Sequence, residues 1–173
     1  EFDNLSAPRL ELRSLYGGIN ILNSTVNGDT IKINNSRSED AINIVGSNFN
    51  LNKIYFNDIL SDAFDSDFSQ INVDSIYCKN IGNDCIDFSY SKSSVNYLDA
   101  YNVLDKVVSL GEDSTLKVQT VLAYDSEIGV VAKDSSILEI NYFGFKNLNI
   151  PISAYIKKQE MGAPSLFIKK ISP

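Results

Sequence analysis

The sequence predicts an all-β fold, a right-handed single-stranded parallel β-helix in which about six coils of 22 residues stack as a solenoid. Three observations support this prediction. A self-similar unit recurs at a spacing of 22 residues, apolar and polar residues alternate within each unit, and Asn, Asp, Ser and Gly separate the alternating stretches. The repeat is clearest where the units begin, at Asp40, Asp62, Asp84, Lys106, Ile128 and Ile150.

We expect one β-helix domain, 1–173, with three parts. Residues 1–15 are expected to cap the N-terminal end of the solenoid or to link it to a missing upstream domain, because the chain starts without an initiator Met. Residues 16–153 are expected to form the coils, with one insertion near Asp113 that shifts the register. Residues 154–173 depart from the coil pattern and are expected to form a C-terminal loop and a cap strand.

The alternation predicts which side chains fill the interior. In the strand 41–45, Ile42 and Ile44 point inward and Asn43 points outward, because side chains alternate across a strand. Like strands of successive coils run parallel, and parallel neighbours need a crossover with a right-handed preference. Stacking then gives two inward columns: Ile42, Phe64, Ile86, Val108, Val130 and Ile152, and Ile44, Ser66, Phe88, Leu110, Ala132 and Ala154.

Composition limits the partners. Apolar residues make up 43% of the chain, yet no stretch is long enough to cross a membrane, so we expect no membrane insertion. The net charge of −7 argues against nucleic acid and repels an anionic sugar polymer unless a cation intervenes. Cys78 and Cys85 are too few for a disulfide scaffold and lack the partners of a zinc site, so we expect packing or surface thiols.

Two segments narrow the fold class further. Residues 61–69 are Ser-Asp-Ala-Phe-Asp-Ser-Asp-Phe-Ser, and residues 82–89 are Gly-Asn-Asp-Cys-Ile-Asp-Phe-Ser. Together with the 22-residue period, they resemble a bacterial subgroup of the right-handed parallel β-helix proteins of the pectate-lyase-like superfamily. The resemblance covers roughly residues 16–160 and implies a carbohydrate-related function with a secreted or cell-surface location.

Carboxylates gather on the outward side of the predicted strands. Asp65 and Asp87 fall in one column, and Asp67 lies two residues beyond Asp65. Adjacent parallel strands are about 4.8 Å apart, so these like charges need compensation. A bound calcium ion, a shared proton with one raised pKa, or a salt link to Lys106 or Lys133 would each supply it.

The same face is the predicted ligand site, and calcium is the only candidate cofactor. The candidate calcium ligands are Asp65, Asp67 and Asp87, and the candidate ligand-binding residues are Asp65, Asp67, Lys133 and Tyr155. Exposed tyrosines would offer stacking platforms for sugars. The tyrosines considered are Tyr90, Tyr97, Tyr101, Tyr124, Tyr142 and Tyr155. The alternative is a solvated surface on which the corner residues Asp40, Asp62 and Asp84 merely bind turn amides.

The candidate catalytic residues are Asp62, Asp84, Asp87 and Lys106. A resemblance to polygalacturonase-type glycoside hydrolases places Asp62 in their Asn-Thr-Asp motif and Asn83-Asp84 at their Asp-Asp motif, with one aspartate missing, and Lys106 stands where their His would be. Glycoside hydrolysis needs two carboxyl groups at a controlled separation. A polysaccharide lyase would instead need a base such as Lys106, with calcium to neutralise the uronate.

Two functions remain open from the sequence. The first is a carbohydrate-associated β-helix module that binds or processes a polysaccharide through the acidic strand face. The alternative is a non-catalytic structural or interaction module, a rigid spacer or an oligomeric surface component of a larger bacterial protein. The expected partners are accordingly a polysaccharide, other domains of a larger chain, or further copies of the chain. A cleft or bound ion beside Asp65 and Asp87 would favour the first function, and a smooth face with an end-to-end contact the second.

Overall fold

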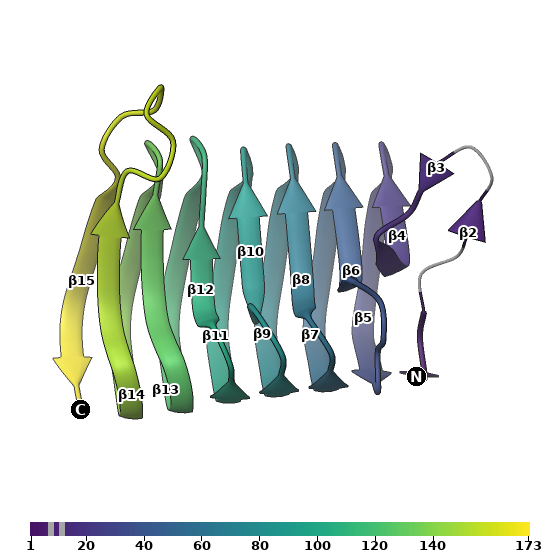
Figure 1. Ribbon diagram of the computed structural model, residues 1–173, viewed down its shortest axis with the longest axis horizontal. Coiled ribbons are helices and arrows are strands. Elements are labelled where there is room, and N and C mark those ends of the chain that lie inside the picture. The colour runs from purple at the N-terminus through teal and green to yellow at the C-terminus, as the bar shows by residue number, and fades with distance from the viewer. Residues whose placement is uncertain (7–8, 11–12) are drawn as a thin grey trace.

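The computed structural model describes residues 1–6, 9–10 and 13–173, and within them it confirms an all-β parallel solenoid of about six turns without helices. In Figure 1 the front strands run upward, the strands behind them run downward, and each coil lies to the left of the preceding one. The winding is therefore right-handed, the usual hand of parallel crossovers. The described residues contain no helix with the length and apolarity needed to span a membrane.

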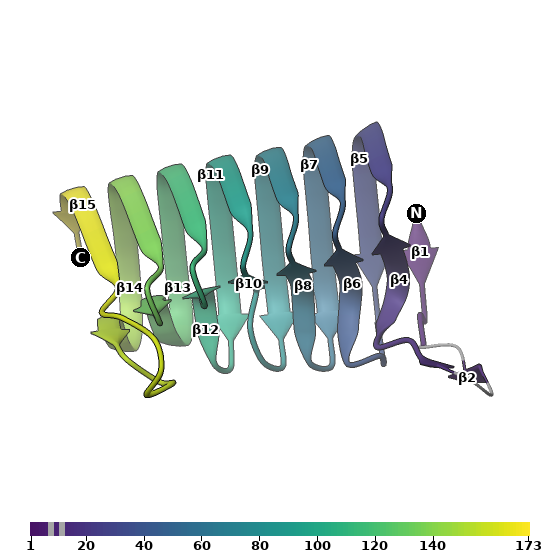
Figure 2. The same ribbon diagram turned by 90° about the horizontal axis from the view of Figure 1, so that it is seen from above.

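Each coil combines a short front strand with a longer strand that returns along the back (Figures 1 and 2). The front strands are β4 (Gly17–Leu22), β6 (Asp40–Val45), β8 (Asp62–Asp67), β10 (Ile86–Ser89) and β12 (Lys106–Leu110). The longer strands are β5 (Thr25–Asn34), β7 (Asn48–Ile59), β9 (Gln70–Ile81) and β11 (Lys92–Val103). In the last coils the two parts are continuous, in β13 (Thr115–Lys133) and β14 (Ile137–Tyr155), and β15 (Ser165–Ser172) ends the stack.

The predicted register is confirmed along the front strands. Asp40 pairs with Asp62, one 22-residue period away, and every pair in this sheet is parallel. The insertion near Asp113 appears as the pairing of Lys92 with Thr115, which are 23 residues apart. The offset is also 23 residues between the first two coils, where Ile19 pairs with Ile42, and it is 22 between the later front strands. The register of the strands keeps the same face of every coil in line.

The two inward columns form the core. Phe64 is fully buried, and its ring centroid lies 5.7 Å from that of Phe49 and 5.2 Å from that of Phe88. The last members of the columns depart from the prediction, because Ile152 is 37% exposed and Ala154 is exposed. The reason is that β15 pairs only with residues 137–144 of β14, so no described strand covers its second half.

The chain ends add short elements to the stack. β1 (Phe2–Asp3) pairs in parallel with β5, and β2 (Arg9–Leu10) pairs antiparallel with β3 (Arg13–Ser14). Residues 7–8 and 11–12 of the expected N-terminal cap lie outside the described residues. At the other end, a loop of residues 156–164 connects β14 to β15, and β15 pairs with β14.

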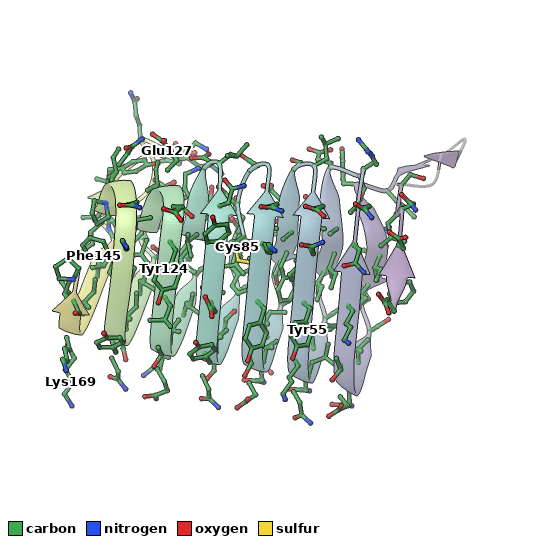
Figure 3. All side chains as sticks on the ribbon, turned by 90° about the horizontal axis from the view of Figure 1, so that it is seen from below. Tyr55, Cys85, Tyr124, Glu127, Phe145 and Lys169 are labelled. Atoms are coloured by element: carbon green, nitrogen blue, oxygen red, sulfur yellow. A yellow bond between two sulfur atoms is a disulfide. The ribbon has the colours of Figure 1, made fainter. Side chains whose placement is uncertain are left out.

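The prediction of two free thiols is wrong. Cys78 and Cys85 form a disulfide, visible beside the Cys85 label in Figure 3. Both side chains are buried, on either side of the corner between β9 and β10, and their Cα atoms are 6.1 Å apart, within the range that a disulfide spans. The number of cysteines alone did not indicate this bond. The inward direction of both side chains, on either side of one corner, would have indicated it.

Candidate functional site

The outward side of the front strands is the acidic strand face. Its acidic residues come from β6, β8, β10 and the corners that lead into them: Asp40, Asp62, Asp65, Asp67, Asp84 and Asp87. Asp65 pairs in register with Asn43 on one side and with Asp87 on the other, as the repeat predicts. Since adjacent strands are about 4.8 Å apart, the carboxyl groups of Asp65 and Asp87 are close neighbours.

Asp65 has the least favourable environment for a negative charge on this face. Burial raises the pKa of Asp65 to about 8, and the carboxylates of Asp40, Asp67 and Asp87 add to the shift. Nδ2 of Asn43 lies 3.4 Å from Oδ2 of Asp65 and 3.0 Å from Oδ2 of Asp40, so a single amide serves both carboxyl groups. At neutral pH Asp65 is therefore largely protonated, which corresponds to the raised-pKa solution among the three that the sequence left open.

The neighbouring carboxyl groups shift in the same direction. Burial raises the pKa of Asp62 and of Asp84 to about 6, against hydrogen bonds that lower it. Burial also raises the pKa of Asp40 and of Asp67 above the ordinary value for Asp, and nearby carboxylates contribute in both cases. Asp40, Asp62, Asp65, Asp67 and Asp84 therefore all have a pKa above the ordinary value for Asp, and the shift is largest at Asp65.

The corner aspartates connect successive coils. Oδ1 of Asp62 accepts a hydrogen bond from the backbone N–H of Asp84 at 2.8 Å, and Oδ1 of Asp84 accepts one from the backbone N–H of Lys106 at 2.9 Å. These are the turn-amide bonds expected if the corner residues have a structural role. One carboxyl oxygen of each catalytic candidate, Asp62 and Asp84, is thus engaged by the backbone.

Lys106 is held by two carboxylates. Its Nζ lies 3.3 Å from Oδ1 of Asp84 and also pairs with Asp105. Burial lowers the pKa of Lys106, but the hydrogen bond to Asp105 and the charge of Asp84 outweigh burial and raise the pKa above its ordinary value. A general base near neutral pH needs the opposite shift. The structure therefore places Lys106 beside Asp84, where it compensates charge.

Two further lysines compensate charge toward the C-terminal side of the face. Nζ of the buried Lys133 donates to Oγ of Ser109 at 2.8 Å and lies 3.9 Å from Oδ1 of Asp87. Lys158, in the loop after β14, pairs with Glu112. Within the acidic strand face, the ion pairs of the described side chains reach only Asp84 and Asp87, and none is formed by Asp40, Asp62, Asp65 or Asp67.

The structure does not bring all predicted ligand residues together. Asp65, Asp67 and Asp87 are neighbours, and Lys133 reaches Asp87. Tyr155 pairs with Lys133 at the end of β14, four strands away from Asp67, which is about 19 Å. The described residues contain no group of three metal-ligating side chains arranged to hold an ion. Calcium binding at the three aspartates stays a prediction, and it would require their side chains to rearrange.

An aromatic pair that the sequence analysis did not recognise borders this face. Phe68 directly follows β8 and Tyr90 directly follows β10, and their rings stack with centroids 4.7 Å apart and planes 5° apart. Phe68 is 62% exposed and Tyr90 is 41% exposed. Tyr90 was a stacking candidate but Phe68 was not, although their 22-residue spacing is the signal that would have paired them.

A second polar region lies along the longer strands. A groove of about 390 Å³ crosses β5, β7, β9 and β11, and its lining includes Asn27, Asn50, Asn72, Asp74 and Asn96. Nδ2 of Asn50 donates to Oδ1 of Asn27, and Nδ2 of Asn72 donates to Oδ1 of Asn50, both at 2.9 Å. Because such amide ladders stabilise stacked strands, this groove already has a structural explanation.

Comparisons of the chain with protein-family models, curated proteins and solved structures found no match. The function must therefore be inferred from the side chains themselves. Ionised carboxylates accept hydrogen bonds from hydroxyl groups, a protonated Asp65 donates one, and exposed aromatic rings pack against apolar surfaces. The acidic strand face and the bordering rings thus offer the contacts that a polyhydroxylated ligand needs.

Proposed function

We propose that the chain is a carbohydrate-binding β-solenoid module that holds a polysaccharide against the acidic strand face. The observation that supports this most is the proximity of Asp65 and Asp67, which form no ion pair with the described side chains, to the exposed aromatic rings of Phe68 and Tyr90 on the adjoining corner. A few polar groups beside an apolar surface are characteristic of ligand sites. The face also crosses four strands, β6 to β12, about 14 Å, which suits a chain of sugars.

Binding is favoured over processing. Asp62 and Asp84 each engage a backbone amide, and the amine of Lys106 is held in ion pairs. If the chain does act on its polysaccharide, the proposed reaction is that of a glycoside hydrolase or a polysaccharide lyase with these residues and Asp87. Release of reducing ends or of unsaturated products from any polysaccharide that binds tests this directly.

Membership in the pectate-lyase-like β-helix proteins, in their bacterial subgroup, is part of the same proposal. The stacked parallel coils support it at the level of fold. The buried disulfide supports a secreted or cell-surface location, because disulfides persist mainly in oxidising environments. The polysaccharide-binding experiment depends neither on the family membership nor on the location of the protein.

The experiment is a screen of immobilised polysaccharides with the parent chain and two double variants. Asp65→Asn with Asp67→Asn removes carboxylates from the acidic strand face and leaves the partner of Lys133 in place. Asp29→Asn with Asp74→Asn makes the same two substitutions of Asp by Asn on the longer strands, where both side chains accept hydrogen bonds from neighbouring asparagines. We expect the first variant to bind at least about tenfold more weakly and the second to bind like the parent.

Two outcomes would contradict the proposal. Equal binding by the face variant and the parent would exclude the acidic strand face as the site. Loss of polysaccharide binding only in the Asp29→Asn, Asp74→Asn variant would place the binding site in the asparagine-lined groove, which includes Asp74.

A structural or interaction module is the second candidate, and a specific observation favours it. The second half of β14 is an open sheet edge that exposes Ile150, Ile152 and Tyr155, which are 45%, 37% and 40% exposed. Open edges with apolar side chains promote pairing with other chains. A monomer by light scattering at high concentration, together with polysaccharide binding, would reject this candidate as the main function.

A further inference from the structure

The corner after each front strand has the same backbone conformation in six successive turns. The residues at this corner have φ between 48° and 63° and are Asn23, Gly46, Phe68, Tyr90, Asp113 and Ser135. This left-handed region favours Gly, Asn and Asp and disfavours bulky side chains. Phe68 and Tyr90 therefore occupy positions that the backbone does not favour, and strained residues of this kind concentrate at functional sites.

The two rings form a platform with one open side. Tyr90 stacks on one face of the Phe68 ring, and the other face is directed toward the preceding coil. The corner residue of that coil is Gly46, which has no side chain of its own, and Oδ1 of Asn23 lies 2.6 Å from the position that a Cβ on Gly46 would take. A ligand ring can therefore pack on Phe68 beside Gly46, next to Asp67 in the chain, when the side chain of Asn23 turns away.

The charges beside the platform favour a cation. On the C-terminal side of the face, the ammonium groups of Lys106, Lys133 and Lys158 pair with Asp84, Asp87 and Glu112. On the side that borders Phe68, the described side chains form no ion pair with Asp65 or Asp67, and the charge of Lys158 acts on Asp67 only from its ion pair with Glu112. An ammonium group of a ligand would give these carboxyl groups the same kind of ion pair that lysines form elsewhere on this face.

We propose that this platform is a subsite for an amino sugar with a protonated amine, whose ring packs on Phe68 beside Gly46 and whose ammonium group pairs with Asp67 and, by displacing the proton that Asp65 holds, with Asp65. The inference rests on the proposed function and names its sugar class. A uronate would be repelled by the same carboxylates, and an N-acetylated sugar lacks the charge. Aromatic rings also attract ammonium groups directly, so Phe68 and the carboxylates favour the same ligand.

The ligand test compares oligomers that differ only at the amine. Binding of β-1,4-linked glucosamine oligomers, N-acetylglucosamine oligomers of the same length, and polygalacturonate is measured by calorimetry at about pH 6, where an ordinary amine is protonated. We expect the glucosamine oligomer to bind at least about tenfold more tightly than its acetylated counterpart, and polygalacturonate not to bind. Added salt should weaken the interaction, because the charges lie near the surface.

The variant test separates the platform from general attraction to an acidic protein. Phe68→Asn keeps every charge, and Asn tolerates the left-handed conformation, so we expect a melting temperature near that of the parent and about fivefold weaker glucosamine binding. Tyr55→Asn is the matched control, because Tyr55 stacks on Tyr77 with centroids 4.7 Å apart but lies on β7. This control should bind like the parent.

A second variant leaves both rings intact. Gly46→Asn keeps the left-handed conformation and places a side chain beside Phe68, where the nearest atom, Oδ1 of Asn23, belongs to a movable side chain. We expect this variant also to bind the glucosamine oligomer about fivefold more weakly. Unchanged binding in both Phe68→Asn and Gly46→Asn would overturn the platform.

The outcomes distinguish this inference from the proposed function. The acetylated oligomer could bind as tightly as the glucosamine oligomer or more tightly, and the Asp65→Asn, Asp67→Asn double variant could lose this binding. That result would reject the amino sugar as the ligand and retain the acidic strand face as the polysaccharide site. Absence of binding to every polysaccharide would reject both. Glucosamine binding that the double variant loses and Phe68→Asn retains would support the carboxylates as the site and reject the aromatic platform.

Discussion

At the scale of single residues, Asp65 shows how an exposed face of a solenoid becomes chemically unusual. Its own coil and the two adjoining coils each contribute carboxyl groups, Asp67, Asp40 and Asp87 among them, and burial adds to their effect. The repeat predicted that these residues would be neighbours. It could not predict the depth of burial, which depends on the side chains around each carboxyl group and decides how far the pKa rises.

The raised pKa of Asp65 predicts a pH-dependent stability. Between the unfolded value near 3.8 and the folded value of about 8, the folded state binds more protons than the unfolded state, so stability falls as pH rises through this window. A full proton difference gives about 1.4 kcal/mol per pH unit. Urea unfolding from pH 5 to pH 8.5 should show this decline, and Asp65→Asn should flatten it above about pH 6, where Asp62 and Asp84 contribute less.

Asp74→Asn is the control for this measurement. Hydrogen bonds from Asn96 and Ser75 lower the pKa of the exposed Asp74, so its titration ends below the pH range of the experiment. Its substitution should leave the slope above pH 6 unchanged. A parent protein whose stability is constant or increases from pH 6 to pH 8 would show that Asp65 is an ordinary ionised surface group.

Phe64 provides a residue-scale test of the core. Phe64→Ala should lower the free energy of unfolding by about 3–5 kcal/mol, because the ring is fully buried and contacts Phe49, Phe56 and Phe88. Phe167→Ala, which removes a ring that is 61% exposed, should cost about 1 kcal/mol or less. Equal losses in the two variants would mean that the strand register is wrong by one residue.

At the scale of elements, the spacing of the repeat was enough to predict strands, their parallel pairing and their inward faces. Ile42 and Ile86 point inward because the period places them on one column and alternation fixes the face. The left-handed corners were not predicted, because Phe68 and Tyr90 are residues that local preferences exclude from that conformation. The exposed second half of β14 was missed because a repeat pattern does not show where covering strands stop.

The disulfide joins the end of β9 to the corner before β10, and its removal should be measurable. Cys78→Ala with Cys85→Ala should lower the free energy of unfolding by about 2 kcal/mol, the lower part of the usual range, because the bond closes a short loop. Reductant should destabilise the parent by a similar amount and leave the double variant unchanged. Two titratable thiols in unfolded parent protein without reductant would contradict the bond.

At the scale of the whole molecule, charge changes systematically along the solenoid axis. The position that Asp40 occupies in its coil is taken by Asp62 and Asp84 in the next two coils, then by Lys106, and then by Ile128. The position of Asp65 is taken by Asp87 in the next coil and then by the uncharged Ser109. Lys133, from a later coil, reaches Asp87. Six of the 22 acidic residues thus lie on one part of one face, which the sequence indicated once the columns were aligned.

This concentration of charge leads to the prediction for calcium. Calcium binds ionised carboxylates, so it must displace the proton that Asp65 holds near neutral pH. Calcium at several times its dissociation constant should therefore stabilise the parent by about 1 kcal/mol at pH 8.5 and by much less at pH 6. For a chain of this length, that corresponds to a rise in melting temperature of about 2–4 °C.

Calorimetric melting at both pH values, with sodium chloride at matched ionic strength, separates calcium binding from screening. Asp65→Asn should melt at a higher temperature than the parent without calcium at pH 8.5, because it removes repulsion, and it should lose the calcium response. Asp87→Asn should not be stabilising, because it leaves the buried Lys133 without its carboxylate. If calcium changes the melting temperature at neither pH, the predicted metal site is wrong, and protons and lysines alone compensate the charge of this face.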